Sequence, residues 1–250
     1  MINSLLEWTG DLGSFSWKVT RAAVTRPFEL REVVRQLDEL GSKSLPLVAL
    51  AGAAVGAVLA LESRSSLAHF GATSMLPAAI MYSIVHEMGP IVTALVVSGR
   101  VGAGIGAELG AMRVTEQIDA IEASAVNPYK LLAFSRILAC IVVLPLLTLV
   151  ADFSGVVAAW ITAALAAPIA FQHFLNKGLS GVTVSDFLAP TLRTCVFGLI
   201  IGLVACFQGM RTEGGTEGVG RSATSAVVLS SLLVIVADVV LVKLILVFFP

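Results

Sequence analysis

The chain has 250 residues, of which 57% are apolar and only 13% are charged, and its formal net charge is −1. This balance is far from that of a soluble domain and indicates a polytopic membrane protein. No basic cluster is interleaved with aromatic residues, so we expect no nucleic acid as a partner. Cys140, Cys195 and Cys206 lie in apolar runs without the spacing of metal ligands, so we expect no metal site.

Residues 1–43 have the pattern of amphipathic helices. A first apolar stripe at helical spacing consists of Leu5, Trp8, Leu12, Phe15 and Val19. A second helix is predicted from Pro27 to Gly41. The apolar residues are spread among polar ones, unlike the continuous core of a signal peptide. We expect this segment to lie on the cytoplasmic leaflet of a membrane; a helical pair packed on itself is the alternative.

Residues 44–250 contain five apolar segments that can each cross a bilayer, which takes about 20 mostly apolar residues. They are 44–62, 76–98, 131–167, 190–209 and 223–249. The third is too long for a simple crossing, and Pro145, Asp152 and Pro168 suggest a kinked or tilted helix that extends beyond the bilayer. The sequence therefore predicts an all-α membrane protein with a five-span domain.

Lysine and arginine residues are distributed unevenly between the two sides of the predicted spans. Twelve lie in segments 1–43, 99–136 and 210–222, whereas the opposite side holds only Arg64 and Lys177. The positive-inside rule places the richer segments, and with them the N-terminus, in the cytoplasm. An odd number of spans then leaves the C-terminus outside.

Glycines four residues apart recur along the predicted spans. The pairs are Gly52/Gly56, Gly102/Gly106, Gly106/Gly110 and Gly198/Gly202. This spacing lets helix backbones approach closely in lipid, so we expect a tightly packed bundle that also packs against a second copy of the chain.

Ionisable side chains inside apolar spans are costly and therefore informative. Glu87, Arg193 and Asp238 lie within spans two, four and five and are candidates for lining a polar cavity. Internal ion pairing or snorkelling toward the membrane surface is the alternative for each of them.

Motifs of common enzymes are incomplete or missing. His86 and Glu87 begin a zinc-protease pattern, but Pro90 stands where the second histidine is required. The sequence has no nucleophile elbow, and Gly41–Ser44 lacks the first glycine of an ATP-binding phosphate loop. We expect no catalytic residue and no cofactor in this chain, so ATP, if used, would be hydrolysed by another subunit.

Segment 113–128 predicts a short cytoplasmic helix between spans two and three. Thr115 suits the N-cap, with Glu116 and Gln117 in the first turn, and Asn127-Pro128 ends the helix. One stripe of this helix is apolar and consists of Val114, Ile118, Ile121 and Ala125. The other stripe is acidic and consists of Glu116, Asp119 and Glu122. An ordinary loop helix lying on the bilayer is the open alternative.

A longer pattern runs through this region. E-M-G-P begins at Glu87, followed by G-R-V-G at 99–102, A-E-L-G at 107–110 and T-E-Q-I-D-A-I-E at 115–122. It resembles the MlaE-type permeases of ABC lipid transporters, the membrane subunits that work with MCE-domain proteins. The resemblance covers about residues 40–245 and is most specific over 87–128. Ser135 departs from it, because the family often has proline before the following arginine.

The resemblance implies an interfacial N-terminal helix, five spans and a cytoplasmic coupling helix at about 114–124. The residues that would contact an ATPase subunit are Thr115, Glu116, Gln117, Asp119 and Glu122. The positions that match polar sites of the family, and are thus candidates for a substrate cavity, are Glu87, Arg100, Arg193 and Asp238. The implied partners are a second copy, ATPase subunits that bind ATP and Mg, an MCE-protein hexamer and phospholipid.

The implied function is that of a permease subunit without chemistry of its own. It would couple closure of the ATPase to lipid movement between a bacterial inner membrane and the MCE partner. The absence of a transit peptide favours the bacterial membrane over a plastid envelope. An ion-coupled secondary transporter is the alternative, with Glu87 or Asp238 as a proton relay, although the inverted repeats expected of it are not seen. The missing motifs disfavour an intramembrane enzyme.

Overall fold

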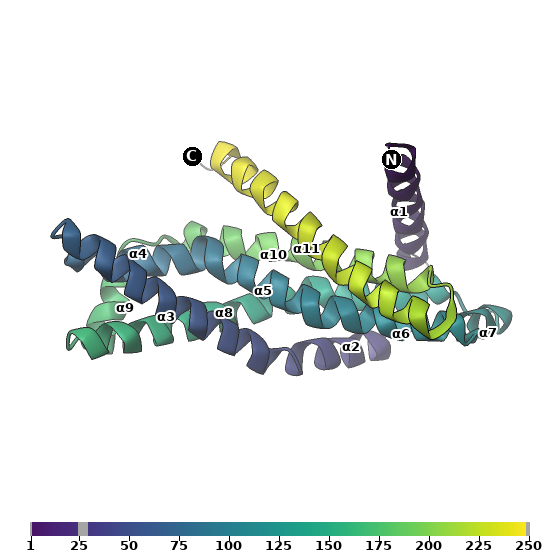
Figure 1. Cartoon of the computed structure of the whole chain (residues 1–250), viewed down its shortest axis with the longest axis horizontal. Helices are drawn as coiled ribbons and strands as arrows, with labels where there is room; N and C mark the ends of the chain where they lie inside the picture. The colour runs from purple at the N-terminus through teal and green to yellow at the C-terminus, as the bar shows by residue number, and fades with distance from the viewer. Residues whose placement is uncertain (1, 25–29, 249–250) are drawn as a thin grey trace.

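The computed structural model describes residues 2–24 and 30–248, and every regular element in these two ranges is helical (Figure 1). The α-helices are α1 (Ile2–Val24), α2 (Leu30–Ser42), α3 (Leu45–His69), α4 (Leu76–Ser83), α5 (Gly89–Val97), α6 (Ala103–Val114), α7 (Gln117–Ala123), α8 (Ser135–Ala166), α9 (Phe171–Leu179), α10 (Val184–Met210) and α11 (Gly215–Phe248). π-Helical turns occupy Ile84–Met88, Ser98–Gly102 and Tyr129–Phe134, and a 3₁₀ turn occupies Thr73–Met75.

Five helical segments are long and apolar enough to cross a membrane, which confirms the predicted number. They are Arg31–His69, Thr73–Val114, Tyr129–Ala166, Val184–Met210 and Gly215–Ile245. The chain is therefore an all-α, multi-pass membrane protein. The connection before the last span is shorter than predicted, because α10 extends to Met210 and α11 already begins at Gly215.

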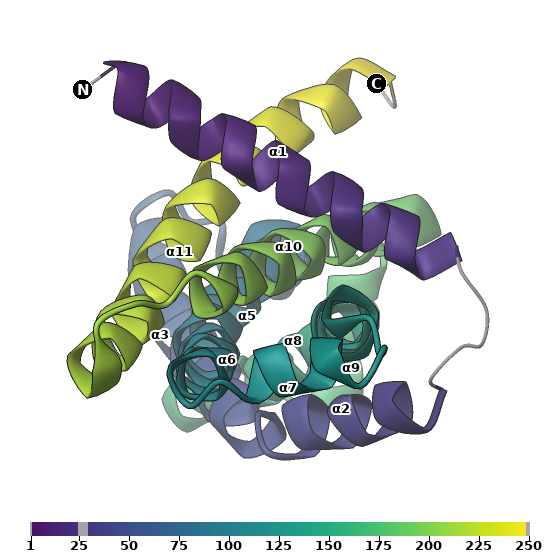
Figure 2. The ribbon, with the colours of Figure 1, turned by 90° about the vertical axis from the view of Figure 1, so that its right-hand side faces the viewer.

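The spans form an elongated bundle with α7 at one end and α9 at the other (Figure 1). α8 packs against α3, α5 and α10, while α11 packs against α6 and α10. The C-terminal end of α11 projects away from the other helices (Figure 1). α1 lies crosswise over the α7 end of the bundle, in contact with α10 (Figure 2).

Glycines allow the close approach of α3, α8 and α10. A Cβ atom added to Gly56 of α3 would overlap the carbonyl of Gly155 in α8, and one added to Gly198 of α10 would overlap the carbonyl of Cys140 in α8. The predicted tight packing is thus confirmed. Since these glycine contacts lie within one chain, the glycine spacing by itself no longer argues for a second copy.

The apolar stripe of α1 packs onto protein. Phe15 and Val19 are buried, and the ring of Phe15 meets those of Tyr129 and Phe207 at centroid distances of 5.8 and 5.6 Å. The predicted start of the second helix at Pro27 and the side chain of Leu5 lie outside the described residues. α2 ends at Ser42, one residue after the predicted end. The placement of these helices on a membrane surface stays a prediction.

Candidate functional site

The second span and the short helix after it meet in a tight backbone turn. α6 continues through Val114, so Thr115 ends that helix and its hydroxyl donates to the carbonyl of Ala111 at 2.8 Å. The prediction that Thr115 caps the following helix was therefore wrong. Glu116 holds the N-cap position of α7 in a left-handed conformation (φ 59°). α7 has seven residues and is shorter than the predicted 114–124, because Val114 ends α6 and Thr115 and Glu116 form the turn between the two helices.

The two faces of α7 differ as predicted for Ile118 and Ile121, whereas Val114 belongs to α6 and the exposed Ala125 lies beyond the end of α7. Ile118 is only 3% exposed and belongs to the main hydrophobic core, and Ile121 packs against that core. The polar side chains face outward and are Glu116, Gln117, Asp119 and Glu122. Asp119 forms an ion pair with Arg113 of α6. Burial of the apolar face fixes the helix to the bundle and leaves its acidic face available to a partner.

The C-terminal end of α7 is also specified by its backbone. Ala125 adopts a left-handed conformation (φ 60°), its N–H donates to Glu122 O, and the N–H of Val126 donates to Ile121 O. This is the Schellman arrangement, in which glycine usually takes the left-handed position. α7 is thus bounded on both sides by left-handed non-glycine residues, which keep it short.

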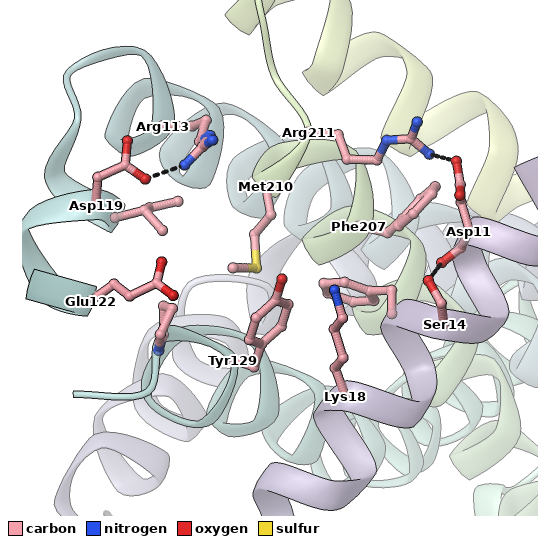
Figure 3. A pocket seen from close by; sticks show the side chains of 13 residues that line it. Asp11, Ser14, Lys18, Arg113, Asp119, Glu122, Tyr129, Phe207, Met210 and Arg211 are labelled. Atoms are coloured by element: carbon pink, nitrogen blue, oxygen red, sulfur yellow. Dashed lines mark hydrogen bonds and ion pairs between the residues drawn. The ribbon is translucent and has the colours of Figure 1, made fainter. Parts of the chain in front are cut away.

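A groove of about 440 Å³ lies between α1, α7 and the end of α10 (Figure 3). Its charged lining consists of Asp11, Lys18, Arg113, Asp119, Glu122 and Arg211. Arg211 pairs with Asp11 at 2.7 Å, and Lys18 lies over the ring of Tyr129 at 5.5 Å. The outer acidic side chains of α7 therefore border a concave, mixed-charge surface of the kind that recognises a protein element.

An ionic cluster lies inside the membrane-spanning part. Arg193 of α10 is 3% exposed and lies 3.4 Å from Glu87 and 3.2 Å from Asp238 of α11. It also donates to the carbonyl of His86 at 2.8 Å. The structure thus brings together three of the four predicted cavity residues. Pairing lowers the penalty of burying the guanidinium, so the internal ion pairing considered as an alternative is present.

Glu87 differs from its two partners because its side chain is 40% exposed, against 5% for Asp238. It lies in the π-helical turn Ile84–Met88, which adds a residue to a helical turn and changes the direction of the side chains that follow. Turns of this kind occur often at functional sites. The accessible carboxylate of Glu87 is therefore the part of the cluster most able to meet a ligand.

A cavity of about 300 Å³ opens beside this cluster. Its lining residues are Tyr82, Ser83, His86, Glu87, Met88, Pro190, Arg193, Val242 and Ile245. The ring centroids of Tyr82 and His86 lie 4.1 Å apart with the rings tilted by 35°, and His86 Nε2 lies 3.6 Å from Asp186. Charged groups occupy one part of the wall and apolar side chains the rest. Such a lining suits an amphiphilic molecule.

Arg100 does not join the cluster. Its guanidinium donates to the hydroxyl of Ser44, near the junction of α2 and α3. The fully buried Asp152 also lies elsewhere, against the backbone of Gly89. These two charges therefore belong to different parts of the bundle from the Arg193 cluster.

Sequence reasoning did not assign Tyr82 or His86 to the cavity wall, and it did not consider Asp186, which lies next to His86. The sequence does hold a signal for Tyr82 and His86. They are four residues apart and therefore lie on the same helix face, near Glu87. Within the described residues, no group of three or more histidine, cysteine, aspartate or glutamate side chains could hold a metal ion.

Comparison with known proteins agrees with this architecture. The family model for Permease MlaE matches residues 33–244. A "Probable ABC transporter permease protein" of Rickettsia felis is 35% identical over 94% of this chain and 91% of its own length. Proteins of the same printed name from Synechocystis and Pyropia yezoensis are 33% and 30% identical, over 83% and 84% of this chain and 79% and 80% of their own lengths. The chain therefore belongs to the MlaE family of ABC transporter permeases.

Proposed function

We propose that this chain is the membrane subunit of an ATP-driven phospholipid transporter. In this proposal, α7 is the coupling helix, and a partner ATPase binds ATP and Mg. A second copy completes the membrane part, and an MCE-domain hexamer receives or delivers lipid on the outer side. The membrane is a bacterial inner membrane, with the N-terminus in the cytoplasm and the C-terminus in the periplasm.

The observation that carries the proposal is the construction of α7. Its apolar face is fixed in the core through Ile118, and its acidic face borders the groove at one end of the bundle. The ion pair between Arg136 of α8 and Glu108 of α6, at 2.7 Å, joins the two helices on either side of α7. A force applied to α7 would therefore be transmitted to both neighbouring spans.

The cavity beside Arg193 supports phospholipid as the class of substrate. Arg193 can pair with a phosphate, Glu87 can pair with an amine, and the apolar wall can receive acyl carbons. The ion pairs of Arg193 with Glu87 and Asp238 support this role for these three residues, whereas the guanidinium of Arg100 contacts Ser44 instead. No bond is made or broken in this process, so the chain needs no catalytic residue.

Co-purification tests the proposal. The tagged chain is extracted in mild detergent, the subunits retained are identified by mass spectrometry, and their ATPase activity is measured. The test variant is the double substitution Glu116→Lys and Glu122→Lys, because both side chains are exposed and neither is ion-paired in the described part of the chain. Glu62→Lys in α3 is the control, since it reverses an exposed charge far from α7.

We expect an ATP-binding subunit to remain with the wild-type chain and the Glu62 variant, and to be lost from the double variant. Loss from neither variant would refute the role given to α7. A chain that purifies without any ATPase, and still moves substrate with an ion gradient alone, would instead establish the secondary transporter.

A further inference from the structure

The end of the bundle opposite α7 carries another pocket, of about 330 Å³. Residues from α3, the 3₁₀ turn, α4, the loop after α8, and α9 line it. They are Arg64, Thr73, Ser74, Leu76, Pro77, Ala167, Ile169, His173 and Lys177. This pocket contains both of the basic residues that the sequence places on the outer side of the membrane, Arg64 and Lys177. Since that side is so poor in cations, their meeting in one pocket is informative.

The charge in this pocket is uncompensated. None of its lining residues is an aspartate or glutamate. Arg64 donates to the backbone carbonyls of Ala163 and Ala166, and neither it nor Lys177 has an ion-pair partner among residues 2–24 and 30–248. His173 and two hydroxyl groups complete the polar lining. Cationic side chains beside hydroxyl donors form a lining that suits a phosphate group.

The surroundings of the pocket are apolar and accessible. Large exposed side chains lie within three residues of its lining and are Phe70, Met75, Leu165 and Phe171. Trp160 packs its ring on Phe171 at 5.0 Å and donates its indole N–H to the carbonyl of Ile169, a lining residue. Aromatic residues with one polar contact are typical of the membrane–water interface. The pocket thus combines a cationic centre with an apolar rim.

We propose that this pocket binds the phosphate-bearing head group of a phospholipid at the outer surface of the membrane. The apolar rim would contact the upper parts of the acyl chains. This inference rests on the membrane orientation in the proposed function, and it adds a lipid site separate from the Arg193 cavity. A free phosphate ion would use the cationic centre but would gain nothing from the rim.

The test is photo-cross-linking of the purified full-length chain in detergent micelles, without an ATPase. The probe is a phosphatidylglycerol with a photoreactive head group, titrated over concentration, and the labelled peptides are identified by mass spectrometry. Label on residues 73–77 or 167–177 reports this pocket, whereas label on residues 82–88 reports the Arg193 cavity. Inorganic phosphate is added as a competitor in a parallel series.

Lys177→Gln is the main variant, because Lys177 is exposed and its side chain forms no hydrogen bond or ion pair in the described structure. A cation near a membrane surface contributes roughly fivefold to lipid affinity, so half-maximal labelling of the pocket should need about five times more probe. Lys177→Arg keeps the charge and should label like wild type. Lys243→Gln is the matched control, since it removes an exposed cation of α11 that does not line the pocket.

Unchanged labelling of the pocket in Lys177→Gln, or its absence in wild type, would overturn the proposal. Complete competition by millimolar inorganic phosphate would assign the site to free phosphate. Normal labelling combined with loss of a co-purifying protein in Lys177→Gln would assign the surface to a protein partner. Since the assay uses no ATPase, failure of the coupling role of α7 would leave its result unaffected.

Discussion

Arg136 of α8 and Glu108 of α6 form an ion pair at 2.7 Å. It links the helix before α7 to the helix after it. The Arg136 side chain is 1% exposed and also donates to the carbonyl of Leu132, whereas Glu108 is half-exposed. The pair thus joins a buried cation to an accessible anion. Its geometry holds the ends of spans two and three together at the position where α7 meets the bundle.

Glu108→Ala should destabilise the protein. Removing the carboxylate leaves a buried guanidinium without its counter-ion, and we expect a loss of about 1–3 kcal/mol in the free energy of unfolding, reduced from the fully buried case because Glu108 is half-exposed. Denaturant titration in detergent measures it. Glu108→Gln should retain part of the stability through a neutral hydrogen bond. Equal stability of the alanine variant and wild type would contradict this account of the pair.

Gly56→Ala should disrupt the packing of α3 on α8, because the new Cβ would overlap the carbonyl of Gly155. We expect a loss of about 1–3 kcal/mol, the usual cost of overpacking. Gly104→Ala in α6 is the control, since a Cβ there meets no atom within 4 Å. It should stabilise the helix by about 0.5–1 kcal/mol. Thermal denaturation of both variants in the same detergent gives the two changes in stability. A loss for Gly56→Ala with a gain for Gly104→Ala would show that helix packing, and not helix propensity, determines the effect at position 56.

Asp238→Asn and Glu87→Gln should separate stability from substrate handling. Asp238 is 5% exposed and paired with the buried Arg193, so its neutralisation should cost about 1–3 kcal/mol of stability. Glu87 is 40% exposed, so its neutralisation should lower the free energy of unfolding by less than about 1 kcal/mol. Both variants should slow phospholipid transfer if the cluster contacts the head group. Normal phospholipid transfer by a stable Glu87→Gln variant would show that the cluster serves only as an internal ion pair.

Ala125→Gly should stabilise α7 at its C-terminal end. The left-handed conformation at this position is unfavourable for a residue with a Cβ, by roughly 1 kcal/mol. Hydrogen exchange of the α7 amides measures the effect locally, and we expect slower exchange in the variant. Ala123→Gly, inside the helix, should speed exchange instead. Faster exchange in both variants would show that the strain at position 125 is absent.

Most of the fold follows from the sequence because long apolar segments in a membrane have few alternatives to helices. The five spans were predicted from the lengths of the apolar segments, and close glycine packing and the apolar positions Ile118 and Ile121 were predicted from residue spacing. That the glycines of α3 pack on α8 was not predicted. The helix ends were not, because propensity gives no signal for a left-handed glutamate or alanine. Glu116 and Ala125 owe that conformation to hydrogen bonds of the turns around α7.

The candidate site was predictable only in part. The cost of burying a charge singled out Glu87, Arg193 and Asp238 in the sequence. Their contact in the structure depends on how spans two, four and five pack together, and the sequence of each span alone does not reveal that packing. Arg100 was grouped with them, although in the structure it binds Ser44. α9 was missed because nine residues carry too short a pattern, so the convergence of Arg64 and Lys177 was also invisible in the sequence.

ATP-dependent phospholipid transfer tests the central claim most directly. The complex purified through this chain is reconstituted in liposomes with a fluorescent phospholipid, and transfer to an acceptor is followed with ATP, with a non-hydrolysable analogue, and with an ion gradient alone. We predict transfer with ATP only, and its loss in the Glu116→Lys, Glu122→Lys double variant but not in Glu62→Lys. Transfer driven by the ion gradient without ATP, at the same rate in the double variant, would contradict the account.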